Sequence, residues 1–137
     1  MNAHPPATEL LTSVARFLRE ELLPTLSGAP AFNLRVSINA VELVRREIEQ
    51  QGAAEERERH RLAQLLGGSA ELAAMREELC EKIARGEITL AEPALRAHLR
   101  ATTIDRLAID QPRYSAYLAA KARRRAGAAN DRETSED

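Results

Sequence analysis

The stretch FNLRVSINAVELVRREIEQ, residues 32–50, decides the fold class of this chain. It begins with apolar and polar side chains in alternation from Phe32 to Ile38, a pattern that is typical of a strand. The alternation fails at Ala40 and Val41, and the whole stretch is compatible with a helix, which we therefore predict. On a helical wheel the apolar side chains cover more than half of the circumference. Such a helix usually lies at the centre of a bundle.

One polar stripe interrupts this apolar surface and is the first candidate site. It consists of Arg35, Asn39, Glu42 and Arg46. In the simpler interpretation the stripe faces solvent, and a Glu42–Arg46 pair contributes a few tenths of a kcal/mol. In the alternative it is a partly buried seam that binds a partner or an anion. Burying an Arg or an Asn without a partner costs roughly 1–3 kcal/mol, so a buried seam would need partners.

Helical periodicity and helix-terminating residues predict the other elements. A first helix is expected over residues 8–23, capped by Thr8 and stopped by Pro24. Gly52 is expected to separate the second helix from a third. Further boundaries are Gly67 and Gly68 after the third helix, Ser69 and Gly86 around the fourth, and Pro93 at the start of the fifth. The sequence predicts an all-α bundle of about five helices plus a short C-terminal one, with the second helix central.

The stretch RLAIDQPRYSAYL, residues 106–118, closes the fifth helix. Pro112 disfavours α geometry at the residue before it. The helix should therefore end near Asp110, and a short helix should begin at Pro112. The two tyrosines of the chain follow, three residues apart, and can anchor this helix on the bundle. The alternative places Asp110, Arg113 and a tyrosine hydroxyl such as that of Tyr114 around a ligand.

The composition fits one soluble domain. We expect a helical domain over residues 1–125 of the 137 and a disordered charged tail over residues 126–137. The net charge of −1 gives no overall field that would attract nucleic acid or an anionic membrane. The single cysteine, Cys80, suits a reducing compartment and is expected to be a buried thiol. No secretory signal or membrane-spanning stretch is recognised, so we expect a cytoplasmic protein.

Few residues are spaced for metal binding or covalent catalysis. The three histidines are far apart, and none lies one helical turn from another or from Cys80. We therefore expect no metal and no cofactor, and a non-enzyme more than an enzyme. The basic run KARRR, residues 121–125, is nearly balanced by four acids in the tail and has no aromatic residues within it. Nucleic-acid binding is not expected from it.

Three stretches together resemble a known protein family: ELLTSVARFLREELLPTL, FNLRVSINAVELVRREIE and LRATTIDRLAIDQPRYSAYL. They resemble a bacterial family of small helical proteins without an established activity. Its members are typically encoded beside an aminoglycoside-phosphotransferase-like kinase and an acyl-CoA dehydrogenase. The resemblance covers residues 8–118. The matching positions are Arg35, Val36, Asn39, Arg46, Glu47, Arg100, Pro112, Arg113 and Tyr114. Gln111 stands where the family often has Asn, and Arg106 where it often has Lys.

The resemblance implies a protein partner and carries over no catalytic residue. The leading hypothesis is a non-catalytic accessory protein of the kinase-like or acyl-CoA-dehydrogenase-like enzyme. The alternative is a small-molecule-binding protein or enzyme with a polar site around Arg35, Asn39, Arg113 and Tyr114. Apolar helix faces left over from the bundle would also allow self-association.

Overall fold

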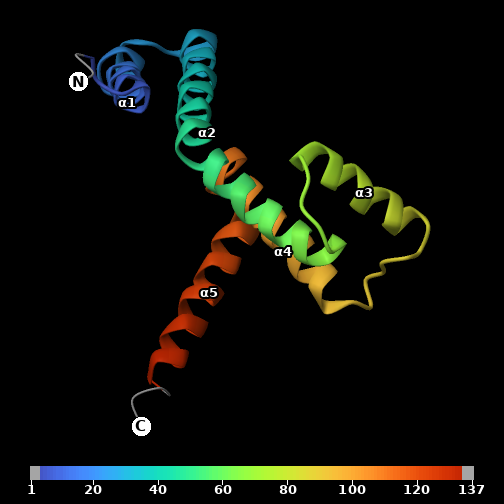
Figure 1. Ribbon diagram of the computed structural model, residues 1–137. Coiled ribbons are helices and arrows are strands. Elements are labelled where there is room, and N and C mark those ends of the chain that lie inside the picture. The colour runs from blue at the N-terminus through green and yellow to red at the C-terminus, as the bar shows by residue number, and fades with distance from the viewer. Residues whose placement is uncertain (1–3, 134–137) are drawn as a thin grey trace. The chain divides into compact units, whose positions relative to one another are not determined.

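The protein is all-α in its computed structural model, which describes residues 4–133 (Figure 1). Helix α1 is followed by a π-helical turn, Leu18–Leu22, and a 3₁₀ turn, Leu23–Thr25. The α-helices are α1 (Ala7–Phe17), α2 (Gly28–Leu66), α3 (Leu72–Ala84), α4 (Pro93–Asp110) and α5 (Ser115–Glu133). The predicted fold class is confirmed.

The chain divides into two compact units, and α2 contributes to both of them. The first unit is Met1–Ala53 and holds α1, the two turns and the N-terminal part of α2. The second unit is Ala54–Asp137 and holds the rest of α2 with the three later helices. The predicted extent of one domain, residues 1–125, stays a prediction.

The break predicted at Gly52 is wrong, because α2 runs without interruption for 39 residues. A single glycine inside a helix costs only about 0.5–1 kcal/mol relative to alanine. The residues on both sides of Gly52 are mostly Glu, Gln, Arg and Ala, which are strong helix formers. The second and third predicted helices are therefore one helix. It ends before Gly67, as predicted, and the backbone of Gly67 has a φ of 76°.

Two predicted N-caps are also wrong. Helix α1 begins at Ala7, directly after Pro6, so Thr8 already lies inside the helix. Helix α3 is capped by Glu71 and not by Ser69. The Glu71 carboxylate accepts hydrogen bonds from the backbone amides of Ala73 at 3.0 Å and Ala74 at 3.4 Å. A longer side chain thus supplies the acceptor that the free amides of a helix start require.

The predicted bounds of α4 are confirmed at both ends. Pro93 is its first residue and Asp110 its last. Before Pro93, the amide of Ala91 donates to Thr89 Oγ1 at 3.3 Å, and the amide of Thr89 donates to Glu92 Oε1 at 3.4 Å. These bonds satisfy backbone donors just before the helix. Pro93 itself occupies the first helical position, where a backbone N–H would have no partner within the helix, so its missing N–H costs nothing.

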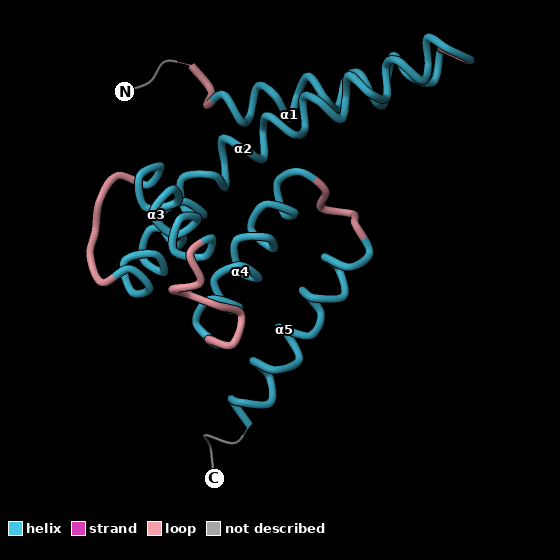
Figure 2. The backbone as a smooth tube through the Cα atoms, turned by 90° about the vertical axis from the view of Figure 1, so that its right-hand side faces the viewer, coloured by secondary structure: helices cyan, strands magenta, loops and turns pink. Residues whose placement is uncertain are grey.

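Helix α5 begins later and runs further than the sequence suggests. It starts at Ser115 and not at Pro112, because residues 111–114 form a turn that leads away from the end of α4 (Figure 2). It then continues to Glu133, so it is not short. Residues 126–133 of the predicted tail are thus helical, and residues 134–137 lie outside the described part. The Ala- and Arg-rich sequence favours this extension.

The apolar core of the second unit lies between the C-terminal part of α2, α3 and the start of α4. Leu62, Met75 and Leu95 are its most fully buried large side chains. The other buried members are Leu72, Leu79 and Ile88. Leu72, Met75 and Leu79 follow one another at helical spacing on α3 and are buried, whereas Ile83, the next apolar residue at that spacing, is 40% exposed.

The first unit buries few large side chains. Its buried apolar residues are Ala15, Ala31 and Ile38, of which only the last is large. An ion pair of 3.9 Å between Arg19 and Glu42 links the π-helical turn to α2. Many large apolar side chains of α1 and α2 remain exposed in this unit.

Candidate functional site: a basic groove

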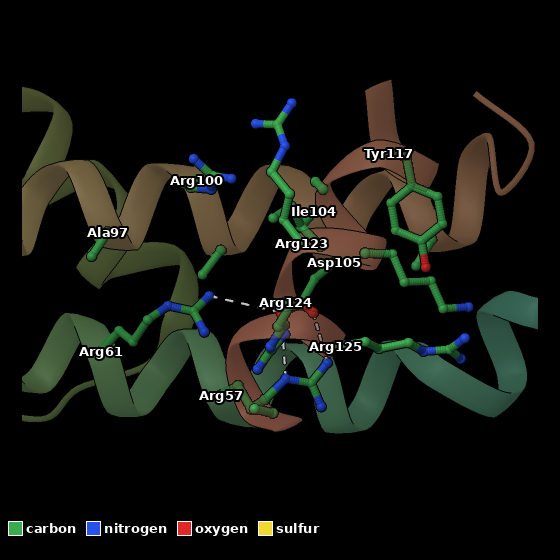
Figure 3. A pocket seen from close by; sticks show the side chains of 15 residues that line it. Arg57, Arg61, Ala97, Arg100, Ile104, Asp105, Tyr117, Arg123, Arg124 and Arg125 are labelled. Carbon is green, nitrogen blue, oxygen red and sulfur yellow. Dashed lines mark hydrogen bonds and ion pairs between the residues drawn. The ribbon is translucent and has the colours of Figure 1, made fainter. Parts of the chain in front are cut away.

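A basic groove of about 820 Å³ lies in the second unit, between the C-terminal part of α2, α4 and α5. Among the lining side chains that the structure describes, seven are cationic and one is acidic. Figure 3 shows arginines from all three helices around this acid, Asp105. The cationic residues are Arg57, Arg61, Arg100, Lys121, Arg123, Arg124 and Arg125.

Asp105 on α4 holds the two arginines of α2. Arg57 Nη2 donates to Asp105 Oδ1 at 2.9 Å, and Arg61 Nη2 lies 3.8 Å from Asp105 Oδ2. Arg61 also donates to Thr102 Oγ1 at 3.1 Å. These contacts fix both guanidinium groups in the wall of the groove. They neutralise only part of the positive charge that the two arginines bring.

The other cations of the groove have no ion pair with any acid whose side chain the structure describes. Among the side chains that the structure describes, Arg100, Arg123, Arg124 and Arg125 form no ion pair, and all four are exposed. Lys121 Nζ lies 5.9 Å from the ring centre of Tyr117, a distance that suits a cation–π contact. The groove therefore carries a net excess of positive charge, although the whole chain has a net charge of −1.

Part of the groove is lined by apolar side chains, most of them small. They are Ala97, Ala101, Ile104 and Ala108 of α4 and Ala120 of α5. Small residues keep the helix surfaces low and leave room above them. The groove thus combines apolar and cationic lining, the composition that ligand sites use to bury an apolar body and orient a charged group.

A buried histidine of α4 lies near Arg61. His98 is buried, and its Nδ1 has no hydrogen-bond partner among the described residues. Burial lowers the pKa of His98, and the nearby charge of Arg61 lowers it further, while Glu58 acts in the opposite direction. His98 is therefore neutral near pH 7. His98 is not among the residues that line the groove.

The predicted site residues are divided between the two units. Arg35 and Asn39 are exposed on α2 in the first unit, and Glu42 and Arg46 there are half-buried. Glu42 pairs with Arg45 at 2.8 Å, and the expected Glu42–Arg46 pair stays a prediction.

In the second unit, Arg113 and Tyr114 lie exposed in the turn between α4 and α5. Neither lines the groove, whereas Arg100 does. Tyr117 is buried, but Tyr114 is 49% exposed, so only one of the two tyrosines anchors α5. The combined site around Arg35, Asn39, Arg113 and Tyr114 stays a prediction.

Sequence reasoning missed the groove because its residues come from three separate segments. The basic run of residues 121–125 was visible, and it appeared to be balanced by acids later in the chain. Arg57 and Arg61 lie one helical turn apart, so they share one face of α2. Two features of the sequence could have indicated the groove. One is this spacing of Arg57 and Arg61, and the other is Arg100, which lies one turn before Ile104 on the Ala-rich side of α4.

Other candidate chemistry is sparse in the part of the chain described. No group of three or more His, Cys, Asp or Glu side chains there is arranged to hold a metal ion. Cys80 is exposed, so the expected buried thiol is wrong. It directly follows the buried Leu79 on α3, and the helix turns it outward. Within residues 4–133, no helix is both long and apolar enough to cross a membrane.

These features define an all-α protein with a cation-lined groove and an exposed apolar face. The family model described as Domain of unknown function (DUF6285) matches residues 24–114, which is more than half of the chain. The protein belongs to this family. Searches among curated proteins and among solved structures found no significant match. The matched region includes Arg57, Arg61, Arg100 and Asp105 of the groove, and ends before α5.

Proposed function

We propose that this protein is a non-catalytic accessory protein that binds a partner enzyme through the exposed apolar face of its first unit. The observation that carries the proposal is a row of exposed side chains on α2, each four residues from the next. Phe32 is 64% exposed, Val36 52%, Val44 45% and Ile48 54%, and the exposed Ala40 completes the row. Rows of this spacing form the ridges with which helices pack against each other.

Helix α1 adds a second apolar row in the same unit. Leu10, Val14 and Phe17 follow at helical spacing and share one face of α1. Each is about half exposed. Contiguous exposed apolar surface is rare on monomeric proteins and marks interaction sites. We call the two rows together the apolar face.

Polar residues border the apolar face. Arg35 lies three residues after Phe32, and Asn39 three residues after Val36, so each neighbours the α2 row on the helix surface. Both are exposed. Protein interfaces commonly combine an apolar centre with a polar rim, in which arginine is enriched. In this proposal Arg35 and Asn39 contribute to partner choice.

The resemblance stated above supports two candidate partners, an aminoglycoside-phosphotransferase-like kinase and an acyl-CoA dehydrogenase, because members of that family are typically encoded beside such enzymes. The test is co-expression of the tagged protein with each enzyme, followed by affinity capture and size-exclusion chromatography. We expect one of the two to co-elute with the wild-type chain. The double variant Phe32→Ser/Val36→Ser should lose the complex and remain folded, because both side chains are already exposed.

A matched control is Leu90→Ser, since Leu90 is 63% exposed but lies in the second unit. This variant should retain the complex. The proposal is overturned if neither enzyme co-elutes, or if Leu90→Ser and the double variant weaken the complex equally. A stable homodimer of the chain alone that the double variant dissociates would assign the apolar face to self-association and also overturn it.

A further inference from the structure

We infer that the basic groove binds a small organic diphosphate that carries an apolar group. The described lining of the groove holds more cationic than acidic side chains. Five of the seven cations, which are Arg100, Lys121 and the three consecutive arginines of α5, are not held by Asp105. Arginine side chains gathered in one groove with so little acid to neutralise them repel each other, and a bound anion removes that repulsion.

The chemistry of the cations favours a phosphate ligand. Six of the seven are arginines, whose planar guanidinium groups pair with phosphate oxygens through two parallel hydrogen bonds. They come from three helices, so they can approach a ligand from several sides. A ligand with two adjacent phosphates would contact more of them than a single carboxylate could.

The size of the groove and the apolar hollow beside it suit a small ligand with an apolar group. The groove volume of about 820 Å³ falls in the range that small-molecule sites occupy. A second hollow of about 310 Å³ shares Arg100, Ile104, Tyr117 and Ala120 with the groove. Its other lining residues include Leu99 and Leu107, and most of its surface is apolar. A diphosphate held by the arginines can therefore place an apolar chain over this hollow.

A macromolecular polyanion fits these observations less well. Binding of single-stranded nucleic acid usually depends on exposed aromatic side chains on which bases stack. The aromatic residue in the groove, Tyr117, is buried.

The test is isothermal titration calorimetry of the full-length protein with three probes: geranyl diphosphate, inorganic pyrophosphate and geraniol. We expect geranyl diphosphate to bind more tightly than pyrophosphate, and geraniol not to bind measurably. Both affinities should fall as salt concentration rises. Strong binding of geraniol, or no binding of either diphosphate, would overturn the inference.

Two variants should change the affinity in opposite directions. Arg124→Gln should lower the affinity for both diphosphates roughly tenfold, because a charge-assisted hydrogen bond is lost. Asp105→Asn should strengthen them several-fold, because it removes the acid of the groove and releases Arg57 and Arg61. A purely structural role for Asp105 predicts weaker binding instead. The control is Arg16→Gln, which removes one positive charge, as Arg124→Gln does, but at an exposed position of α1. It should leave the affinity for both diphosphates unchanged.

A variant of the adjoining hollow separates its role from that of the charges. Leu107→Asn should lower the affinity for geranyl diphosphate and leave the affinity for pyrophosphate unchanged. Equal weakening of both would contradict the placement of the apolar group. A 20-nucleotide single strand that binds through Arg124 while geranyl diphosphate does not bind would assign the groove to nucleic acid and overturn the inference.

Discussion

Arg76 on α3 donates two hydrogen bonds to the buried carboxylate of Glu58 on α2, at 2.9 Å to Oε1 and 2.6 Å to Oε2. The guanidinium hydrogen bonds lower the pKa of Glu58 against the opposing effect of burial. The same contact raises the pKa of Arg76. This bidentate pair fastens α3 to α2 at the edge of the apolar core.

Removing Arg76 should destabilise the second unit. We expect Arg76→Gln to lower the free energy of unfolding by about 1–3 kcal/mol, because the buried Glu58 carboxylate loses its charged partner. Urea denaturation followed by circular dichroism measures this. The control is Arg85→Gln, whose ion pair with Glu81 is exposed on both sides. It should cost less than about 1 kcal/mol, and equal losses in the two variants would contradict the assigned role of Arg76.

The buried His98 should make stability depend on pH. Its pKa is lowered in the folded protein by burial and by Arg61, with Glu58 opposing. Above the unfolded pKa of about 6.5, the imidazole is neutral in both states. As pH falls below that value, the unfolded chain takes up a proton that folded His98 resists, so the free energy of unfolding decreases.

This dependence is measured by urea denaturation between pH 7.5 and pH 5.5. Glu58 does not interfere in that window, because its lowered pKa affects stability only as pH falls below the ordinary carboxyl range. The variant His98→Leu keeps the site buried and removes the titrating group. Its stability should change less over the window, and an unchanged pH dependence would show that another group is responsible.

Helix α3 is capped by Glu71 in the structure, whereas the sequence pattern predicted Ser69, and two variants can distinguish these caps. Glu71→Ala should lower the free energy of unfolding by about 1 kcal/mol, because the amides of Ala73 and Ala74 lose their acceptor. Ser69→Ala should have an effect within about 0.5 kcal/mol. Thermal denaturation of the two variants gives the comparison, and a larger loss for the serine variant would restore Ser69 as the cap.

The core of the second unit should respond strongly to truncation. Leu62 is fully buried, so Leu62→Ala should cost about 2–5 kcal/mol. Ile83 lies one helical turn after the buried Leu79 but is 40% exposed. Ile83→Ala should therefore cost clearly less. Chemical denaturation of both variants measures the difference, and similar losses would mean that Ile83 is as well packed as Leu62.

The sequence correctly predicted the bounds of α4, which depend on local chemistry. Pro93 and Asp110 bound α4 as expected, because proline and capping residues act over one helical turn. Gly52 was misleading, since one glycine weakens a helix by less than its neighbours stabilise it. The cap at Glu71 was missed because a glutamate is not a usual N-cap residue.

The site was harder to predict than the fold. The groove joins Arg57, Arg100 and Arg124 through the packing of three helices, and no local pattern specifies that packing. The predicted stripe contained Arg35 and Asn39, which are exposed beside the apolar face. The apolar pattern of α2 was read as a sign of burial. In the first unit, Phe32 and Ile48 are instead more than half exposed.

The proposed partner binds the apolar face, and hydroxyl-radical footprinting of the complex with the captured enzyme tests this most directly. Phe17 and Phe32 are 51% and 64% exposed in the free chain, and Tyr114 in the second unit is 49% exposed. We predict that both phenylalanines are labelled in the free protein and protected in the complex, while labelling of Tyr114 is unchanged. Undiminished labelling of Phe17 and Phe32 in the complex, with protection of Tyr114, would contradict the account.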